Sequence, residues 1–440
     1  MIQSLHQSFS HQLNEKLQKK VARIGIMGLG YVGLPTACYY AEQGYNVTGF
    51  EISSEKVGKL NQGLDYKNSV NPQRLEKILR DHSFIATTDM KQLREMDVIF
   101  ICVPTPITLE KNPDLTYVKD AGLKVAKYVA NGTLIILEST TYPGTTEAYI
   151  VQPLVERGFI VGDTIFVAYS PERIDPGNIE FDLKNTPKVV GGMTQTCTEL
   201  ASRCIGDTAH PVSGVQTAEL SKVFENTFRW VNIGLVNELA VLCHELKIDV
   251  WETIQAAASK PYGFMKFTPG IGVGGHCIPV DPYYLTYKAK EKGKRTKFID
   301  VAGEINEGMV QYVYIRILEL LAKHNTFIKQ SHVVILGASY KPNIGDLRES
   351  PVINLVEYLQ GKSKHLTIID PYVDELFIHG KIQPIKAYES SLIQKADIVI
   401  IGTPHDCFEW EDIYKHSKLI FDSKNIMKQK GYCASFIETL

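Results

Sequence analysis

The chain has 440 residues, too many for a single hydrophobic core, so two or three domains are expected. Its 47 lysines and arginines nearly balance 49 aspartates and glutamates, and the formal net charge of -2 argues against nucleic acid as a partner. The apolar fraction is 44%, but no unbroken apolar run approaches 20 residues, so the sequence predicts a soluble globular protein with no membrane association.

Residues 1–20 lack a continuous apolar segment followed by a small-residue cleavage site, so they do not read as a secretory signal. Apolar residues recur there at helical spacing and predict a helical extension on the first domain: Ile2, Leu5, Phe9, Leu13 and Leu17. The eight cysteines have no paired short spacings, which fits neither a disulfide framework nor a Cys-x-x-Cys metal site. A reducing, cytoplasmic compartment is therefore expected.

Between Val21 and about Gly206, apolar strands alternate with amphipathic segments, as is typical of a doubly wound α/β domain. Six buried parallel strands are expected at ARIGIMG, YNVTGFE, DVIFICVP, TLIILEST, IFVAYSP and PKVVGG. From Gln216 to Ile248 the apolar period becomes 3.6 residues, which predicts one helix on the order of 45 Å long at a rise of about 1.5 Å per residue. Such a helix would bridge domains and carry a subunit interface.

Helical, charged sequence continues to about Asn325, and the alternation then resumes at HVVILGA, LTIIDP, DIVIIGTP and KLIFDSKN. The sequence thus predicts two doubly wound, Rossmann-like domains joined by a central helical region. The expected limits are 1–20 for the extension, 21–206 for the first domain, 207–325 for the helical region and 326–440 for the second domain.

A dinucleotide site is indicated by Gly28, Gly30 and Gly33, which form G-x-G-x-x-G between a strand and a helix. Glu51 ends the next strand, where a carboxylate binds both ribose hydroxyls and repels a 2'-phosphate, so NAD is expected rather than NADP. Glycines that serve only a tight turn are the alternative. The expected cofactor contacts also include Leu29, Tyr31, Val32, Lys56, Pro104 and Thr105, although Lys56 could equally be a solvated surface lysine.

The segment GVGGHCIPVDP at residues 272–282 sets a thiol, Cys277, among glycines. Three explanations are open: a buried structural cysteine, a metal ligand together with His276, or a covalent nucleophile with Asp281 handling protons or water. No other Cys or His cluster completes a metal site, so no metal is expected. With an NAD site, a nucleophilic thiol indicates oxidation of an aldehyde through a thiohemiacetal and a thioester.

The sequence resembles the UDP-glucose/GDP-mannose dehydrogenases. The motifs GLGYVG, CVPTP, ESTTYPGTTE, YSPERIDPG, ELSKVFENTF, GVGGHCIPVDP and LGASYKPNIGDLRESP occur in family order across most of the chain. The resemblance implies oxidation of the C6 alcohol of a nucleotide sugar to a carboxylate with two NAD. It also implies a homodimer formed through the central region and a product used in surface polysaccharide synthesis, such as capsule or O-antigen.

Carried over by motif, Cys277 matches the family's nucleophile and Asp281 its partner carboxylate. Lys222 matches a lysine that stabilises oxyanions, and Asn226, one helical turn later, would add a donor on the same face. The resemblance also assigns Thr141 to the nicotinamide and hydrolytic water, with a turn threonine as the alternative, and Glu172 to proton transfer.

Four more positions bear on the substrate. Glucose-oxidising members have a second glutamate where this chain has Pro176, and Arg173 replaces an apolar residue and could face the substrate. Arg348 and Lys341 match cofactor and substrate contacts, or could form salt bridges with nearby acids. The expected substrate-binding set is Glu172, Arg173, Lys222, Asn226, Phe267, Gly270, Gly274 and Lys341, and Arg348 and Thr141 belong to the cofactor set.

The segments HCIPVDPYYL and SPER resemble those of family members that act on UDP-N-acetylhexosamines, so UDP-N-acetylglucosamine is the first choice. UDP-N-acetylgalactosamine, UDP-N-acetylmannosamine and UDP-glucose are the alternatives, because one hydroxyl orientation separates the epimers. Two other classes stay open: a non-catalytic NAD-binding module, and a one-step oxidoreductase of the 2-hydroxy acid kind. The first would bind NAD without turnover, and the second would release one NADH per substrate.

Overall fold

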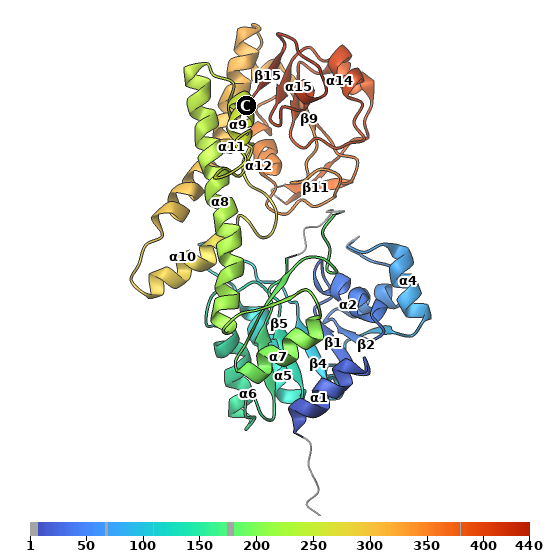
Figure 1. The fold of residues 1–440 in the computed structure, drawn as a ribbon. Coiled ribbons are helices and arrows are strands. Elements are labelled where there is room, and N and C mark those ends of the chain that lie inside the picture. Colours follow the sequence, from blue (N-terminus) through green and yellow to red (C-terminus); the bar gives the residue numbers. More distant parts are fainter. Residues whose placement is uncertain (1–7, 67–68, 109, 174–179, 379) are drawn as a thin grey trace, which may run out of the picture. The chain divides into compact units, whose positions relative to one another are not determined.

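The computed structural model describes residues 8–66, 69–108, 110–173, 180–378 and 380–440. These residues form two compact units, one of residues up to Glu225 together with Tyr283–Gly293, the other of Asn226–Pro282 and Lys294–Leu440. Each unit contains one large, mainly parallel sheet flanked by helices (Figure 1). The fold is therefore α/β with two Rossmann-like sheets, as the sequence predicts.

The first unit is built on a sheet ordered β3-β2-β1-β4-β5-β6-β7-β8. Its first six strands are all parallel, with the crossover at β1/β4 that doubly wound sheets use for ligands. In that order the strands are Phe84–Thr87, Asn46–Phe50, Arg23–Met27, Val98–Ile101, Leu134–Leu137, Phe166–Tyr169, Lys188–Gly192 and Ala209–Pro211. Strands β3 and β8 were not predicted.

One strand differs from the prediction. β7, the PKVVGG segment, pairs antiparallel with β6 rather than parallel. Parallel neighbours need a crossover, usually a helix, and no described residue between β6 and β7 is helical, so the chain returns in the opposite direction.

The helices of the first unit pack on both faces of its sheet. Leu13 and Leu17 of α1 (Phe9–Gln18) enter the same apolar core as Ile24 and Ile26 of β1; Ile2 and Leu5 lie outside the described residues. The other helices are α2 (Gly33–Glu42), α3 (Ser54–Asn61), α4 (Pro72–Arg80), α5 (Thr116–Tyr128), α6 (Gln152–Glu156) and α7 (Gln195–Ile205), with a 3-10 helix at Met90–Glu95 and a short π-helix at Glu147–Val151.

The second unit has a parallel sheet ordered β10-β9-β13-β14-β15. Along β9, Val333 and Ile335 enter one core, whereas Val334 and Leu336 enter another on the opposite face, so helices bury both faces. The strands, in sheet order, are His365–Ile369, His332–Leu336, Ile398–Ile401, Ile420–Asp422 and Ile437–Thr439; β11 (Glu375–Ile378) and β12 (Lys381–Pro384) pair antiparallel.

The helices of the second unit are α9 (Val250–Ala258), α11 (Lys297–Lys323), α12 (Pro351–Leu359), α13 (Ser390–Lys395), α14 (Trp410–His416) and α15 (Ile426–Gln429), with a short turn at Ile328–Gln330. Two further helices belong partly to each unit: α8 (Val215–Leu246), with 32 residues, and α10 (Asp281–Glu291). The predicted long helix at 216–248 is thus confirmed. Across the described ranges, no helix combines the length and apolarity that crossing a bilayer requires.

Candidate active site

The glycine loop of the first unit lies between β1 and the N-terminus of α2. Gly28 has φ +87°, and a Cβ there would lie 2.9 Å from the Cys102 carbonyl oxygen. A Cβ on Gly33 would lie 1.8 Å from the Gly28 carbonyl oxygen, so only glycine lets helix and strand pack this closely. At Gly30, by contrast, a Cβ would meet no described atom within 4 Å, which leaves room for a phosphate against the backbone.

Glu51 follows β2, and its buried carboxylate accepts hydrogen bonds from the main-chain N–H groups of Ile52 at 3.0 Å and Ser53 at 3.3 Å. Next to the loop, the Tyr66 hydroxyl donates to the Leu29 carbonyl at 2.6 Å, and Lys56 Nζ lies 5.2 Å from the centre of the Tyr66 ring. Lys56 is therefore held at the glycine loop by a cation–π contact rather than lying free in solvent.

Further predicted cofactor residues follow the next two strands. After β4, Pro104 is exposed and Thr105 is buried, with the Thr105 carbonyl accepting from the Tyr284 hydroxyl at 2.8 Å. After β5, Thr141 is fully buried, and its Oγ1 has no hydrogen-bond partner among the described residues. An orphaned hydroxyl at the carboxyl end of a parallel strand, together with the open space at Gly30, fits a bound NAD.

Glu172 follows β6 and belongs to a buried charge cluster. Lys188 Nζ, on β7, forms ion pairs with Glu138 and, at 3.4 Å, with Glu172, while the Cys102 thiol donates to Glu138 Oε2 at 3.1 Å. Burial disfavours the ammonium, but the two carboxylates outweigh it and raise the pKa of Lys188 above its usual value. Burial also raises the pKa of Glu138 despite Lys188. Sequence reasoning missed Lys188, which pairs with Glu172, and Glu138, which pairs with Lys188.

Arg173 is held by neighbours within the first unit. Its guanidinium pairs with Glu225 and donates to the Pro187 carbonyl at 2.8 Å. Pro176, three residues further on, lies outside the described residues.

The α8 segment places Lys222 and Asn226 one turn apart, both largely buried. Upstream on the same helix, the fully buried Glu219 accepts hydrogen bonds from the N–H groups of Gly144 at 2.7 Å and Thr146 at 2.8 Å. This contact fixes α8 to the turn that follows Thr141. No sequence motif could predict it, because the Glu219 acceptor lies 75 residues from the Gly144 donor and 73 residues from the Thr146 donor.

In the second unit, Cys277 is an exposed thiol immediately before α10. Its carbonyl accepts from the Asp281 N–H at 2.8 Å, which begins the helix. Asp281 is 2% exposed, and Asn226 Nδ2 donates to its Oδ2 at 2.5 Å. The structure thus brings two of the predicted catalytic side chains together beside the thiol segment. Burial and Arg348 lower the pKa of His276, which keeps this imidazole neutral at pH 7.

The predicted substrate residues before the thiol are anchored to the helices. The Gly270 N–H donates to Asn237 Oδ1 of α8 at 3.0 Å, and the Phe267 and Phe228 rings meet edge to face at 5.9 Å. Gly274 packs so tightly that a Cβ would lie 2.5 Å from Tyr340 Cβ.

The segment after β9 carries Lys341 and Arg348. Arg348 forms an ion pair with Asp346, with Nη2 2.6 Å from Oδ2, so the salt bridge weighed as an alternative is present. Both side chains are partly exposed.

One cation near this segment was missed. A Cβ on Gly270 would lie 2.5 Å from Lys424 Nζ, and no described carboxylate forms an ion pair with that ammonium. Burial lowers the pKa of Lys424, although Asp422 opposes the shift. A lysine directly after a buried parallel strand, at the edge where ligands bind, is the signal that could have identified it.

Three family models cover most of the chain. The NAD binding domain of the UDP-glucose/GDP-mannose dehydrogenase family matches residues 22–205, the central domain 216–308 and the UDP binding domain 334–429. The chain belongs to this family. It is accordingly an oxidoreductase, an NAD-dependent UDP-sugar dehydrogenase.

Curated relatives of the dehydrogenase carry two substrate names. The UDP-N-acetyl-D-mannosamine dehydrogenase of Pyrococcus horikoshii is 36% identical over 420 residues, covering 92% of this chain and 96% of the relative. The UDP-N-acetyl-D-glucosamine 6-dehydrogenase of Pseudomonas aeruginosa is 36% identical over 425 residues, covering 93% and 98%. The solved structure of the Pyrococcus horikoshii UDP-D-ManNAc dehydrogenase superposes with a TM-score of 0.85 at 34% identity, covering 95% and 98%.

Proposed function

We propose that this dehydrogenase oxidises the C6 hydroxyl of a UDP-N-acetylhexosamine to the uronic acid in two steps, with UDP-N-acetylglucosamine as the first choice. The observation that carries the proposal is the arrangement around Cys277: an exposed thiol lies four residues before a helix whose first residue, Asp281, is buried against Asn226. NAD, when bound at the glycine loop, supplies the hydride acceptor for both oxidations.

The residues divide the chemistry as follows. After the first oxidation, Cys277 Sγ adds to the C6 aldehyde carbon and forms a thiohemiacetal, which the second oxidation converts to a thioester. Water then attacks that carbon, its oxygen enters the product and the C–S bond breaks, which restores Cys277. Asp281 and Glu172 accept protons, Lys222 and Asn226 stabilise the oxyanions, and Thr141 orders the attacking water.

Lys424 extends the substrate set. Its ammonium lies beside Gly270, lacks an ion-pair partner among the described carboxylates and belongs to the unit matched by the UDP binding domain. We assign it to the anionic part of the UDP-sugar. Arg173, Phe267, Gly270, Gly274 and Lys341 stay predicted substrate contacts.

The proposal also covers the cellular compartment, the use of the product, the domain limits and the oligomeric state. We place the enzyme in the cytoplasm as a supplier of uronic acids for surface polysaccharides, and we retain the four-part domain division expected from the sequence. Large apolar residues recur on one exposed stripe of α8, which supports a homodimer: Leu220, Phe224, Phe228, Leu235, Leu242 and Leu246.

The stoichiometry of NADH tests the proposed reaction. Incubation with UDP-N-acetylglucosamine, its galacto and manno epimers and UDP-glucose is expected to give two NADH per acid, fastest with the first. Cys277→Ala should reduce acid formation by about 10³-fold or more, whereas Cys433→Ala, at another exposed cysteine, should not change it. One NADH per product, or full activity of Cys277→Ala, would exclude the thiol mechanism.

A further inference from the structure

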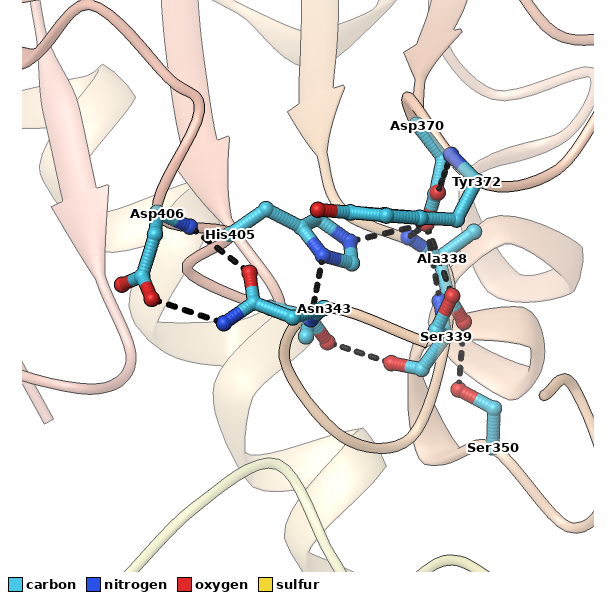
Figure 2. Close-up of polar contacts among 9 residues, drawn as sticks. Ala338, Ser339, Asn343, Ser350, Asp370, Tyr372, His405 and Asp406 are labelled. Carbon is cyan, nitrogen blue, oxygen red and sulfur yellow. Dashed lines mark hydrogen bonds and ion pairs between the residues drawn. The ribbon is translucent and has the colours of Figure 1, made fainter. Parts of the chain in front are cut away.

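A buried polar cluster occupies the carboxyl ends of three neighbouring strands in the second unit (Figure 2). Ser339 follows β9, Asp370 follows β10 and His405 follows β13. His405 is fully buried and Asp370 is 4% exposed. No part of the reaction above uses these side chains.

Asp370 is the acceptor at the centre of the cluster. Its Oδ2 accepts from the main-chain N–H groups of Ala338 at 2.8 Å and Ser339 at 3.1 Å, and from Ser339 Oγ at 3.0 Å. Burial favours the protonated acid, but the hydrogen bond from His405 and those from main-chain N–H groups lower the pKa of Asp370, so the carboxylate is ionised at neutral pH.

The two ring nitrogens of His405 have different partners. Nδ1 lies 2.9 Å from the main-chain nitrogen of Asn343, which can only donate, so Nδ1 accepts. Nε2 lies 3.1 Å from Asp370 Oδ2 and therefore carries the proton. Asn343 also exchanges two hydrogen bonds with Asp406, at 2.7 Å and 2.9 Å. Its φ of +64° shows that the chain turns sharply there.

The loop that contains Asn343 also contacts the segment that carries Cys277. This loop, Ser339–Ser350, contacts the backbone before Cys277: the Gly275 N–H donates to the Arg348 carbonyl at 3.0 Å. A Cβ on Gly274 would lie 2.9 Å from the Glu349 carbonyl oxygen. The position of the loop therefore sets the position of the chain two residues before the nucleophile.

We propose that His405, oriented by Asp370, is a positioning residue for Cys277. It acts through the main chain of Asn343 on the loop Ser339–Ser350, and through the Arg348 carbonyl on the thiol segment. The inference rests on the proposed function only in giving Cys277 its catalytic role.

Two substitutions at His405 separate its two hydrogen bonds. In His405→Asn, Oδ1 stands near the former Nδ1 and keeps an acceptor for the Asn343 N–H. In His405→Gln, the amide nitrogen stands near the former Nε2 and keeps the donor to Asp370 but loses that acceptor. His416→Gln is the control, because His416 also pairs with an aspartate, Asp412 on α14, although through Nδ1 and at a partly exposed site.

Hydrogen exchange of the peptide 273–280, measured by mass spectrometry without substrate, measures the effect of His405 on the segment that carries Cys277. His405→Gln is expected to accelerate exchange there about tenfold, and kcat should fall by a similar factor with KM for NAD unchanged. His405→Asn, which keeps the acceptor for Asn343 but loses the donor to Asp370, should accelerate exchange less than His405→Gln, and His416→Gln should match the wild type. The second variant, Asp406→Ala, removes an exposed anchor of Asn343 and should accelerate exchange about twofold to threefold.

Unchanged exchange at 273–280 in both His405→Gln and Asp406→Ala would overturn the inference. Equal acceleration in every peptide of the second unit would also overturn it, because it would show a general loss of stability. A wild-type protein that exchanges as expected but oxidises no UDP-sugar would refute the proposed function alone.

Discussion

Lys188 is the residue on which two buried carboxylates depend. Removing the ammonium in Lys188→Met takes the ion-pair partner from the buried Glu138 and one partner from Glu172, so we expect the free energy of unfolding to fall by about 3–5 kcal/mol at pH 8. The loss should shrink toward pH 5, because protonating the carboxylates relieves it. Thermal melts at both pH values check this, with Lys188→Arg as the charge-preserving control. A loss that is independent of pH would contradict the ion-pair explanation.

Because of Lys424, we expect the affinity for UDP to depend on pH. Because its pKa is lowered, its ammonium is lost as pH rises through that lowered value, whereas an ordinary lysine stays charged. The affinity for UDP should therefore fall as pH rises through that lowered value, before an ordinary lysine would lose its charge, and Lys424→Arg should remove most of the fall, since a guanidinium keeps its charge. Calorimetric titration with UDP measures both. The same alkaline weakening in Lys424→Arg would refute the assignment.

At the scale of one element, the glycine loop offers a matched pair of substitutions. Gly33→Ala places a Cβ against the Gly28 carbonyl and should lower the melting temperature by several degrees, about 2–3 kcal/mol in unfolding free energy. Gly30→Ala has room in the protein, so its melting temperature should stay unchanged while affinity for NAD falls at least about tenfold. Melts and NAD titrations of both variants test this. Normal NAD binding by Gly30→Ala would place the phosphates elsewhere.

Elements with a clear period could be predicted from the sequence, and those set by long-range pairing could not. The 3.6-residue period located α8 to within two residues at either end. The antiparallel direction of β7 is set by its pairing with β6, and no local pattern encodes that pairing. β8, with only three residues, is too short to show a period.

At the scale of the whole molecule, the stripe on α8 predicts the oligomeric state. Leu235 and Leu242 are 60% and 53% exposed and lie seven residues apart on one face of α8, so together they form part of an apolar patch. The double variant Leu235→Arg/Leu242→Arg should halve the mass measured by light scattering. Phe377→Arg, at a residue 72% exposed on β11, is the control and should leave it unchanged. A monomeric wild type would refute the homodimer.

The candidate site could be predicted in part, for a physical reason. Gly28, Gly33 and Cys277 stand in compact motifs whose spacing carries the chemistry, so the sequence alone indicated them. Glu219 and Lys188 act through partners far away in the chain, and only the fold brings those partners together. The motifs thus indicate candidate reacting groups, whereas the groups that contact them in the fold carry no local sequence signal.

The bond between the Gly275 amide and the Arg348 carbonyl joins two peptide groups. Every amino acid except proline presents the same donor, and every one presents the same acceptor. Alanine at position 348 would therefore leave this bond intact, so the substitution would not report what the bond contributes to the thiol segment. Replacing the amide with an ester by chemical synthesis is the kind of change that would expose it.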